Sequence, residues 1–200
     1  MHIALTADPE LPVPPRHYGG IERIIDLLAR ELSRRGHRVT LFEQGRELLG
    51  GASANNQNRL HLGFHYPRCP ETVRQCREGF ERFCAEFRGC VRADFPNAYF
   101  IAQEGSRTSP EAFLQFCDDQ ALPFERLELA SFRPRPRNVS LGVLTGERVY
   151  DVALLRAALG AQLRTLGVEV RLGTRVERVA RTRLGGFELA LVGGEREGFD

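Results

Sequence analysis

The first 43 residues carry a strand–helix–strand pattern, which constrains the fold more than any other stretch of this 200-residue chain. The apolar residues 3–7 predict one strand, and Arg38–Phe42 predicts another. Between them, apolar residues recur with the spacing of one helical face, at Ile21, Ile24, Ile25, Leu28 and Leu32. Gly36 stands where such a helix usually ends. Because a crossover of this kind favours parallel strands, we predict an α/β fold with a Rossmann-like parallel sheet.

An acid, Glu43, directly follows the second predicted strand. In a nucleotide-binding unit of this type, an acid here accepts hydrogen bonds from the adenosine ribose, and the first turn binds the pyrophosphate through N–H groups. The usual GxGxxG turn is absent. Residues 8–18, with four prolines, and the pair Gly19 and Gly20 take its place. These glycines either present N–H groups to a phosphate or only let the loop enter the helix, and both interpretations stay open.

Residues 50–68 form a polar segment that is too rich in Gly and Asn for a core. The small residues at 50–53 allow the backbone to approach a phosphate-bearing ligand closely. His61 and His65 follow within the same segment. Histidine titrates near neutral pH, so each is a candidate proton donor or hydrogen-bond partner, with a purely structural role as the alternative. We interpret the segment as a binding loop built largely from backbone.

The composition excludes several classes of protein. The chain has 28 basic and 26 acidic residues, and no basic block is interleaved with aromatic residues, so we expect no nucleic-acid partner. No apolar run is long enough for a membrane span, and no signal peptide is visible. The five cysteines are odd in number and lack CxxC spacing, which fits a reducing cytoplasm. We expect Cys76, Cys84 and Cys90, which lie on or close to one apolar helical face, to be buried small apolar groups rather than metal ligands.

Helical and strand patterns continue through the rest of the chain. Helices are predicted over residues 71–91, 110–120 and 152–166, and strands over 98–103, 139–144, 168–172, 175–179 and 187–192. We expect residues 1–70 and 145–200 to form the Rossmann-like domain, and residues 71–144 to form an inserted α+β segment on the substrate side. The turn at 193–198 usually begins another strand, so the end at Asp200 predicts a truncation.

From Glu43 onward, the chain resembles FAD-dependent oxidoreductases of the D-amino-acid-oxidase (DAO) type. The resemblance rests on GGAS at 50–53, NRLHLGFHYPR at 58–68, EGSRTSPEAF at 104–113, and the late segments DVALLRAAL and GVEVRLGTRVERV. It implies that FAD is the cofactor and that a small molecule is the substrate. In that family the acid binds the AMP ribose, the GGAS loop follows the pyrophosphate and ribityl chain, and the next stretch approaches the flavin ring.

Carried over by position, the resemblance implicates residues along most of the chain. The expected cofactor-binding residues, with the glycine pair of the first turn included, are Gly19, Gly20, Glu43, Gly50, Gly51, Ala52, Ser53, Leu60, Gly63 and Val176. Val176 is expected to contact the adenine through its backbone. The expected catalytic residues are Arg59, His61 and His65. No metal is expected.

Residues 1–42 resemble a different family, the family-4 glycosyltransferases of the GT-B fold. The resemblance is carried by PVPPRHYGGIERIIDLLARELSRRGHRVTLF, in which the glycine pair lies near the donor diphosphate in that family. Together, the two resemblances predict a join between superfamilies near RRGHRVTLFE.

The predicted function is therefore hydride transfer from a small amine or hydroxy substrate to a flavin. The alternatives are a glycosyltransferase fragment that uses a nucleotide sugar, and an inactive fragment with a folded nucleotide site. We expect weak or no FAD binding by this chain, because a typical pyrophosphate turn and the closing part of a DAO-type enzyme are both absent. The sequence leaves the substrate, the electron acceptor and the oligomeric state open.

Overall fold

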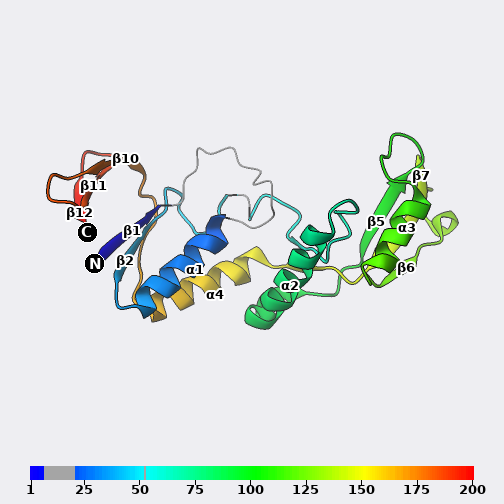
Figure 1. The fold of residues 1–200 in the computed structure, drawn as a ribbon, viewed down its shortest axis with the longest axis horizontal. Coiled ribbons are helices and arrows are strands. Elements are labelled where there is room, and N and C mark those ends of the chain that lie inside the picture. Colours follow the sequence, from blue (N-terminus) through cyan, green and yellow to red (C-terminus); the bar gives the residue numbers. More distant parts are fainter. Residues whose placement is uncertain (7–20, 52) are drawn as a thin grey trace. The chain divides into compact units, whose positions relative to one another are not determined.

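A computed structural model describes residues 1–6, 21–51 and 53–200, with only the backbone at residue 6 and over residues 21–27 (Figure 1). These residues form two compact units. The first unit consists of Met1–Asn56 and Val152–Asp200, and the second unit is Gln57–Asp151. Each unit has its own hydrophobic core. The expected domain division near residues 70 and 144 stays a prediction, because compactness alone does not assign a function to a unit.

The first unit is built on a parallel sheet with the order β1-β2-β9. Its strands are β1 (His2–Thr6), β2 (Arg38–Phe42) and β9 (Glu169–Arg171). Helix α1 (Ile21–Arg34) connects β1 to β2, and α4 (Val152–Thr165) precedes β9. Both strand pairs are parallel. The predicted α/β fold with a Rossmann-like parallel sheet is confirmed.

Strand β2 is buried on both faces. Val39 and Leu41 pack with Ala29 of α1 and Leu163 of α4, and Figure 1 shows these two helices side by side. Phe42 belongs to a separate core that includes Leu189, Leu191 and Phe199. Successive side chains of a strand point to opposite faces of the sheet, so this alternation places helices on one face and a second sheet on the other.

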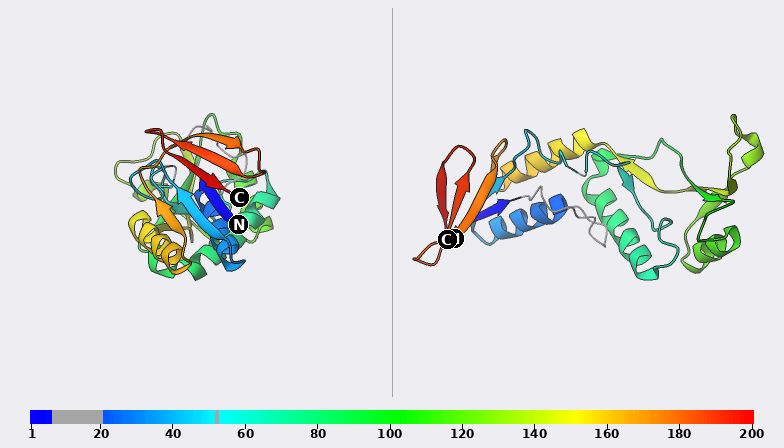
Figure 2. Two further views of the ribbon diagram at one scale, coloured as in Figure 1. Left: turned by 90° about the vertical axis from the view of Figure 1, so that its left-hand side faces the viewer. Right: turned by 90° about the horizontal axis from the view of Figure 1, so that it is seen from above.

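That second sheet is antiparallel and consists of β10 (Val176–Arg181), β11 (Phe187–Leu191) and β12 (Arg196–Phe199). Figure 2 shows it in orange and red beside β1 and β2. The sequence predicts that residues 145–200 contribute to the parallel sheet, but of these residues only β9 belongs to it. The reason is the length of the connections. Tight turns such as residues 182–186 join antiparallel strands, whereas parallel strands need a crossover of a dozen residues or more.

The second unit contains two further antiparallel sheets, with the orders β5-β7-β6 and β3-β8-β4. The strands are β3 (Arg59–Leu60), β4 (Val91–Arg92), β5 (Asn97–Ala102), β6 (Phe124–Arg126), β7 (Val139–Thr145) and β8 (Arg148–Tyr150). The helices are α2 (Pro70–Glu86), α3 (Pro110–Asp119) and the 3₁₀ helices Arg88–Cys90 and Leu129–Ser131. Phe113 and Phe116 of α3 pack on Leu141 and Val143 of β7.

The long helix predicted over residues 71–91 ends earlier than expected. Helix α2 stops at Glu86, and the N–H of Phe87 closes its last turn on the carbonyl of Phe83. Val91 then pairs with Tyr150 in the β3-β8-β4 sheet. The apolar spacing continues past residue 86, but the pairing with a distant strand overrides it. Strands of two or three residues, such as β3 and β4, are too short to show an alternating pattern in the sequence.

The five cysteines are all reduced in this structure. Cys90 and Cys117 are buried, Cys76 and Cys84 are half-buried, and Cys69 is exposed. The burial expected for Cys76, Cys84 and Cys90 is therefore complete only for Cys90. Among the described residues, no group of three or more His, Cys, Asp or Glu side chains could hold a metal ion. No helix within the described ranges is both long enough and apolar enough to cross a membrane.

Two glycines of the second unit allow a matched test of its packing. Gly63 has φ +113°, and a Cβ there would lie 2.7 Å from Cγ1 and 2.9 Å from Cα of Val73. Gly79 lies inside α2, and a Cβ there would meet nothing within 4 Å. We expect Gly63→Ala to lower the free energy of unfolding by about 2 kcal/mol. Gly79→Ala should raise it by about 1 kcal/mol. Urea unfolding followed by circular dichroism measures both; equal effects would contradict the described packing.

The cysteines should differ in reactivity. The Thr72 side chain lowers the pKa of the exposed Cys69 thiol through a hydrogen bond, whereas burial raises the pKa of Cys117 to about 12 and that of Cys76 to about 11. Since the thiolate is the reactive form, iodoacetamide at roughly pH 8 should modify Cys69 first in the folded chain. Mass spectrometry of timed samples measures the order. Equally fast labelling of Cys117 would show that its burial is wrong.

Candidate functional site

Glu43 begins a loop at the carboxyl end of β2, and this loop is bonded to the chain that follows β9. The N–H of Glu43 donates to the carbonyl of Arg171 at 3.0 Å, and the Glu43 carbonyl accepts from Thr174 at 2.9 Å. The N–H of Gly173 likewise donates to the carbonyl of Gly45 at 2.8 Å. Val176, two residues after Thr174, begins β10. The structure therefore brings the segments of two predicted site residues together at the carboxyl ends of parallel strands, where ligands bind in open α/β sheets.

The Glu43 carboxylate is held by its own loop. Its Oε1 accepts a hydrogen bond from the N–H of Gly45 at 2.6 Å. A Cβ at Gly45 would lie only 3.0 Å from this oxygen. The absence of a side chain at Gly45 therefore lets its backbone lie close to the Glu43 carboxylate. A carboxylate has about four lone-pair sites on two oxygens, so this one bond leaves acceptor capacity for ribose hydroxyls. The chemistry and placement of Glu43 thus fit the ribose of an adenine dinucleotide.

The rest of the loop is fixed by side chains on both sides of Gly50 and Gly51. The Asn55 amide donates to the Gly50 carbonyl at 3.2 Å and to the Gly51 carbonyl at 2.8 Å. Arg156 of α4 pairs with Glu47 at 2.8 Å and donates to the Leu48 carbonyl at 2.6 Å. These contacts hold an exposed, side-chain-poor stretch of backbone in place. Ser53 follows it and is half-buried.

Three predicted site residues, Gly19, Gly20 and Ala52, lie outside the described residues. Leu60 lies in β3, where it pairs with Arg148 of β8. Gly63 packs against Val73 of α2, which by itself explains why this position needs glycine.

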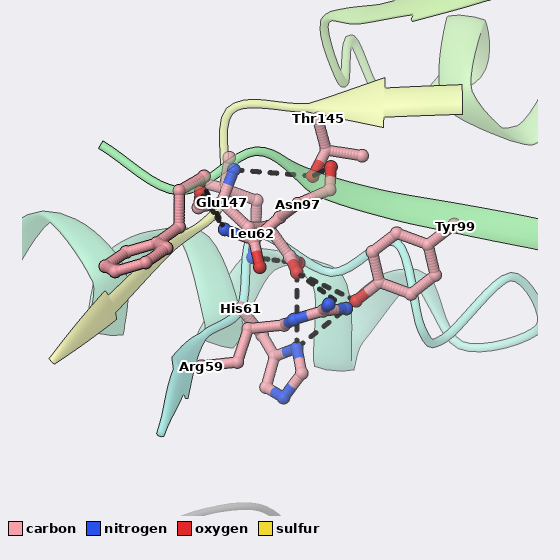
Figure 3. Close-up of polar contacts among 8 residues, drawn as sticks. Arg59, His61, Leu62, Asn97, Tyr99, Thr145 and Glu147 are labelled. Atoms are coloured by element: carbon pink, nitrogen blue, oxygen red, sulfur yellow. Dashed lines mark hydrogen bonds and ion pairs between the residues drawn. The ribbon is translucent and has the colours of Figure 1, made fainter. Parts of the chain in front are cut away.

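The second unit contains a polar cluster around Glu147, which lies between β7 and β8 (Figure 3). The Glu147 side chain has no exposed surface. Its Oε1 accepts from the N–H of Leu62 at 2.8 Å, and its Oε2 accepts from the Tyr99 hydroxyl at 2.8 Å. Its backbone carbonyl accepts from the Asn97 amide at 2.8 Å. A buried carboxylate is tolerated only when donors match it, and the segments of Leu62 and Tyr99 supply them.

Two predicted catalytic residues converge on this carboxylate. Arg59 Nη1 lies 3.8 Å from Glu147 Oε2, and the guanidinium lies 5.0 Å from the centre of the Tyr99 ring. His61 Nδ1 lies 3.6 Å from the same Oε2 and 3.3 Å from the Tyr99 hydroxyl oxygen. The exposed fraction of the side chain is 19% for Arg59 and 11% for His61. Both side chains therefore keep some exposed surface in a cluster whose carboxylate is fully enclosed.

The third predicted catalytic residue, His65, lies at the edge of this group. Its ring centre is 6.1 Å from that of His61 and 5.3 Å from that of Tyr66. His65 is exposed and has a ring contact with His61, but the contacts described here do not link it directly to Glu147. Its role as a catalytic residue stays a prediction.

The electrostatics of the cluster keep Tyr99 protonated. Burial raises the pKa of the Tyr99 hydroxyl well above its usual range, and the negative charge of Glu147 raises it further. The nearby Arg59 acts in the opposite direction but does not outweigh them. Tyr99 is therefore a neutral hydrogen-bond donor at physiological pH. Neither Tyr99 nor Glu147 could be predicted from the sequence, because each looks like an ordinary polar residue of a strand or turn until the fold brings it to residues 59–62.

Removing the central carboxylate should destabilise the second unit. Glu147→Ala would leave the Leu62 N–H and the Tyr99 hydroxyl without their buried acceptor, so we expect a loss of about 3 kcal/mol in unfolding free energy. Glu125→Ala, at an exposed position of β6, is the matched control and should change it by less than about 0.5 kcal/mol. Chemical denaturation measures both. If Glu147→Ala left the free energy of unfolding unchanged, the carboxylate could not be buried as described.

Comparison with known proteins gives a consistent result. Residues 27–199 match the sequence model of the family described as FAD dependent oxidoreductase (DAO). The chain is also similar to the FAD-dependent monooxygenase kojA of Aspergillus flavus, with 31% identity over 166 residues. That alignment covers 78% of this chain and 37% of the fungal protein.

Two solved structures share the fold. Glycine oxidase from Geobacillus kaustophilus superposes with a TM-score of 0.62 and 20% identity, covering 88% of this chain and 50% of that one. Dithionite-reduced L-α-glycerophosphate oxidase from Mycoplasma pneumoniae, with FAD bound, gives a TM-score of 0.66 and 18% identity. It is covered to 47%, and this chain to 84%. The chain therefore spans half or less of the length of these three proteins.

Proposed function

The chain belongs to the FAD-dependent oxidoreductase family of the DAO type, whose cofactor is FAD, and from this premise we propose that it takes part in oxidising a small amine or hydroxy substrate. The observation that carries the proposal is the position of Glu43. It stands at the carboxyl end of a parallel strand, in a loop bonded to the residues just before Val176. This is the frame in which an acid binds the adenosine ribose of a dinucleotide.

The cofactor would be held mainly by the first unit. Glu43 would accept hydrogen bonds from the ribose, and the backbone of Val176 would contact the adenine. The stretch with Gly50, Gly51, Ala52 and Ser53 would follow the pyrophosphate and ribityl chain, with Gly19 and Gly20 near the phosphates. Leu60 and Gly63 would approach the flavin ring. These roles are proposals for the individual residues.

When bound, FAD accepts a hydride from a C–H bond next to nitrogen or oxygen. The protein residues position the substrate and take up the proton that the substrate loses. Arg59 and His61 both keep exposed surface in the cluster around Glu147, so we assign them these tasks. Arg59 supplies a positive charge and several donors for an anionic or polar group, and His61 supplies a nitrogen that exchanges protons.

A second candidate function is monooxygenation, because the fungal relative with 31% identity carries that name. The two reactions differ in the fate of molecular oxygen. Oxidation coupled to oxygen releases hydrogen peroxide, whereas oxygenation leaves one oxygen atom in the product. With any substrate that reduces the cofactor, mass spectrometry of the product formed under ¹⁸O₂ separates the two.

The resemblance of residues 1–42 to family-4 glycosyltransferases, and the join that it predicts, remain predictions. The flavoprotein match begins at residue 27, inside this segment, which supports the oxidoreductase over the nucleotide-sugar alternative. The cytoplasmic location also remains a prediction from the cysteine pattern.

FAD titration of the 200-residue chain tests the proposal. We expect weak but saturable binding in an isothermal titration, since the first turn lacks the usual glycine motif. Glu43→Gln should weaken FAD binding about tenfold, because a hydrogen bond to a charged group contributes about 1.5 kcal/mol or more.

The control variant is Glu188→Gln, which changes a glutamate that pairs with Arg196 across β11 and β12. It should bind FAD as the wild type does. UDP-glucose is titrated in parallel as a probe of the glycosyltransferase alternative. Binding of UDP-glucose without binding of FAD would overturn the proposed function, and equal FAD affinity of wild type and Glu43→Gln would remove Glu43 from the site.

A further inference from the structure

We infer that Arg156 of α4 is a positioning residue of the cofactor site. By binding the carbonyl of Leu48, it orients the loop of residues 44–51 so that this loop presents N–H groups, and not carbonyl oxygens, to the phosphates of FAD. The role toward FAD rests on the proposed function, whereas the hold of Arg156 on the loop follows from the contacts of the first unit alone.

The loop contains a backbone conformation that needs support. Leu49 has a φ of 59°, in the left-handed region. A bulky residue is strained there and keeps this conformation only where its surroundings fix it. The Leu49 side chain is buried, and Leu48 packs on the core of the parallel sheet. These apolar contacts anchor the turn, while hydrogen bonds to its peptide units set their orientation.

Arg156 supplies the hydrogen bond to the peptide unit that enters this turn. Its Nε donates to the Leu48 carbonyl at 2.6 Å, and its Nη1 lies 2.8 Å from Glu47 Oε2. The exposed fraction of the side chain is 25% for Arg156 and 55% for Glu47. An ion pair with an exposed carboxylate contributes little, whereas a charged donor on a backbone carbonyl makes a strong hydrogen bond. The main effect of Arg156 is therefore on the Leu48 carbonyl.

The orientation of this carbonyl also fixes the next N–H group. In a trans peptide unit, the C=O and N–H bonds are held in one plane and point in opposite directions. Because the Leu48 carbonyl is directed to Arg156, the N–H of Leu49 points away from Arg156. Within the described part of the chain, the Leu49 N–H donates no hydrogen bond. It is therefore available to a ligand.

Asn55 acts in the same way on the glycines that follow. Its amide donates to the Gly50 carbonyl at 3.2 Å, so the N–H of Gly51 points away from the Asn55 side chain. Among the described residues, the N–H groups of Gly50 and Gly51 also find no acceptor. Successive N–H groups beside a left-handed residue can bind an anion, whereas carbonyl oxygens in their place would repel a phosphate.

Removing the donor of Arg156 tests both parts of the inference. Arg156→Met keeps a long unbranched side chain but cannot bind the Leu48 carbonyl. In the chain without FAD, ¹⁵N relaxation should give order parameters of about 0.8 for Leu49, Gly50 and Gly51 in the wild type and below about 0.6 in Arg156→Met. FAD binding, followed by flavin fluorescence, should weaken about tenfold, because the cofactor must then order the loop.

Three further variants separate positioning from other roles. Arg156→Lys keeps a charged donor and should restore part of the loop order and of the FAD affinity. Arg164→Met, at an exposed position in the last turn of α4, is the matched control. Glu47→Gln removes the ion pair but keeps the bond to Leu48. The last two should change FAD affinity less than about twofold, whereas tighter binding by Glu47→Gln would show that the Arg156 charge itself contacts the phosphates.

The possible results are distinguishable. Unchanged order parameters in Arg156→Met would overturn the hold of Arg156 on the loop. A looser loop with the FAD affinity of the wild type would overturn its role as a positioning residue. If the wild-type chain bound no FAD at all, the proposed function and the role of Arg156 toward FAD would both fail, while the order parameters would still decide whether Arg156 holds the loop.

Discussion

Burying the carboxylate of Glu147 imposes the strictest requirement on the second unit. An unmatched charge would cost several kcal/mol, so the fold must bring donors to both of its oxygens. It does so from two distant segments, with the Leu62 N–H on Oε1 and the Tyr99 hydroxyl on Oε2. Meeting this requirement fixes the strand β5 and the chain after β3 against the turn between β7 and β8. Arg59 and His61 are placed as a consequence.

The first unit is governed by a different constraint, which is the burial of β2 on both faces. Val39 and Leu41 pack on helices, and Phe42 packs on the antiparallel sheet. Both faces of the strand are therefore covered, and a ligand can reach only its polar carboxyl end. Glu43 stands at that end. The hydrogen bonds between the loops after β2 and β9 then bring Val176 near it. Under the proposed function, Glu43 would accept hydrogen bonds from the adenosine ribose of FAD.

Features with a local signal could be predicted from the sequence. The bounds of β2, the start of α3 at Pro110, and the acid after β2 all rest on neighbouring residues. Resemblance to a family also singled out Arg59 and His61, and the structure places both side chains in the cluster around Glu147. Their partners could not be predicted, because Glu147 is 85 residues from Leu62 and its neighbours Gly146 and Arg148 suggest an ordinary turn. The early end of α2 was missed for the same reason, since it depends on a strand pairing with Tyr150.

The charge state of Glu147 is the point on which the description of the cluster depends most. Infrared difference spectroscopy between the wild-type chain and Glu147→Gln, at neutral pH and with ¹³C-labelled glutamate, observes this group directly. The difference spectrum should contain the carboxylate stretching bands of Glu147 and no C=O band of a protonated carboxyl group. A protonated-carboxyl band that disappears in Glu147→Gln would contradict the donor arrangement around this residue.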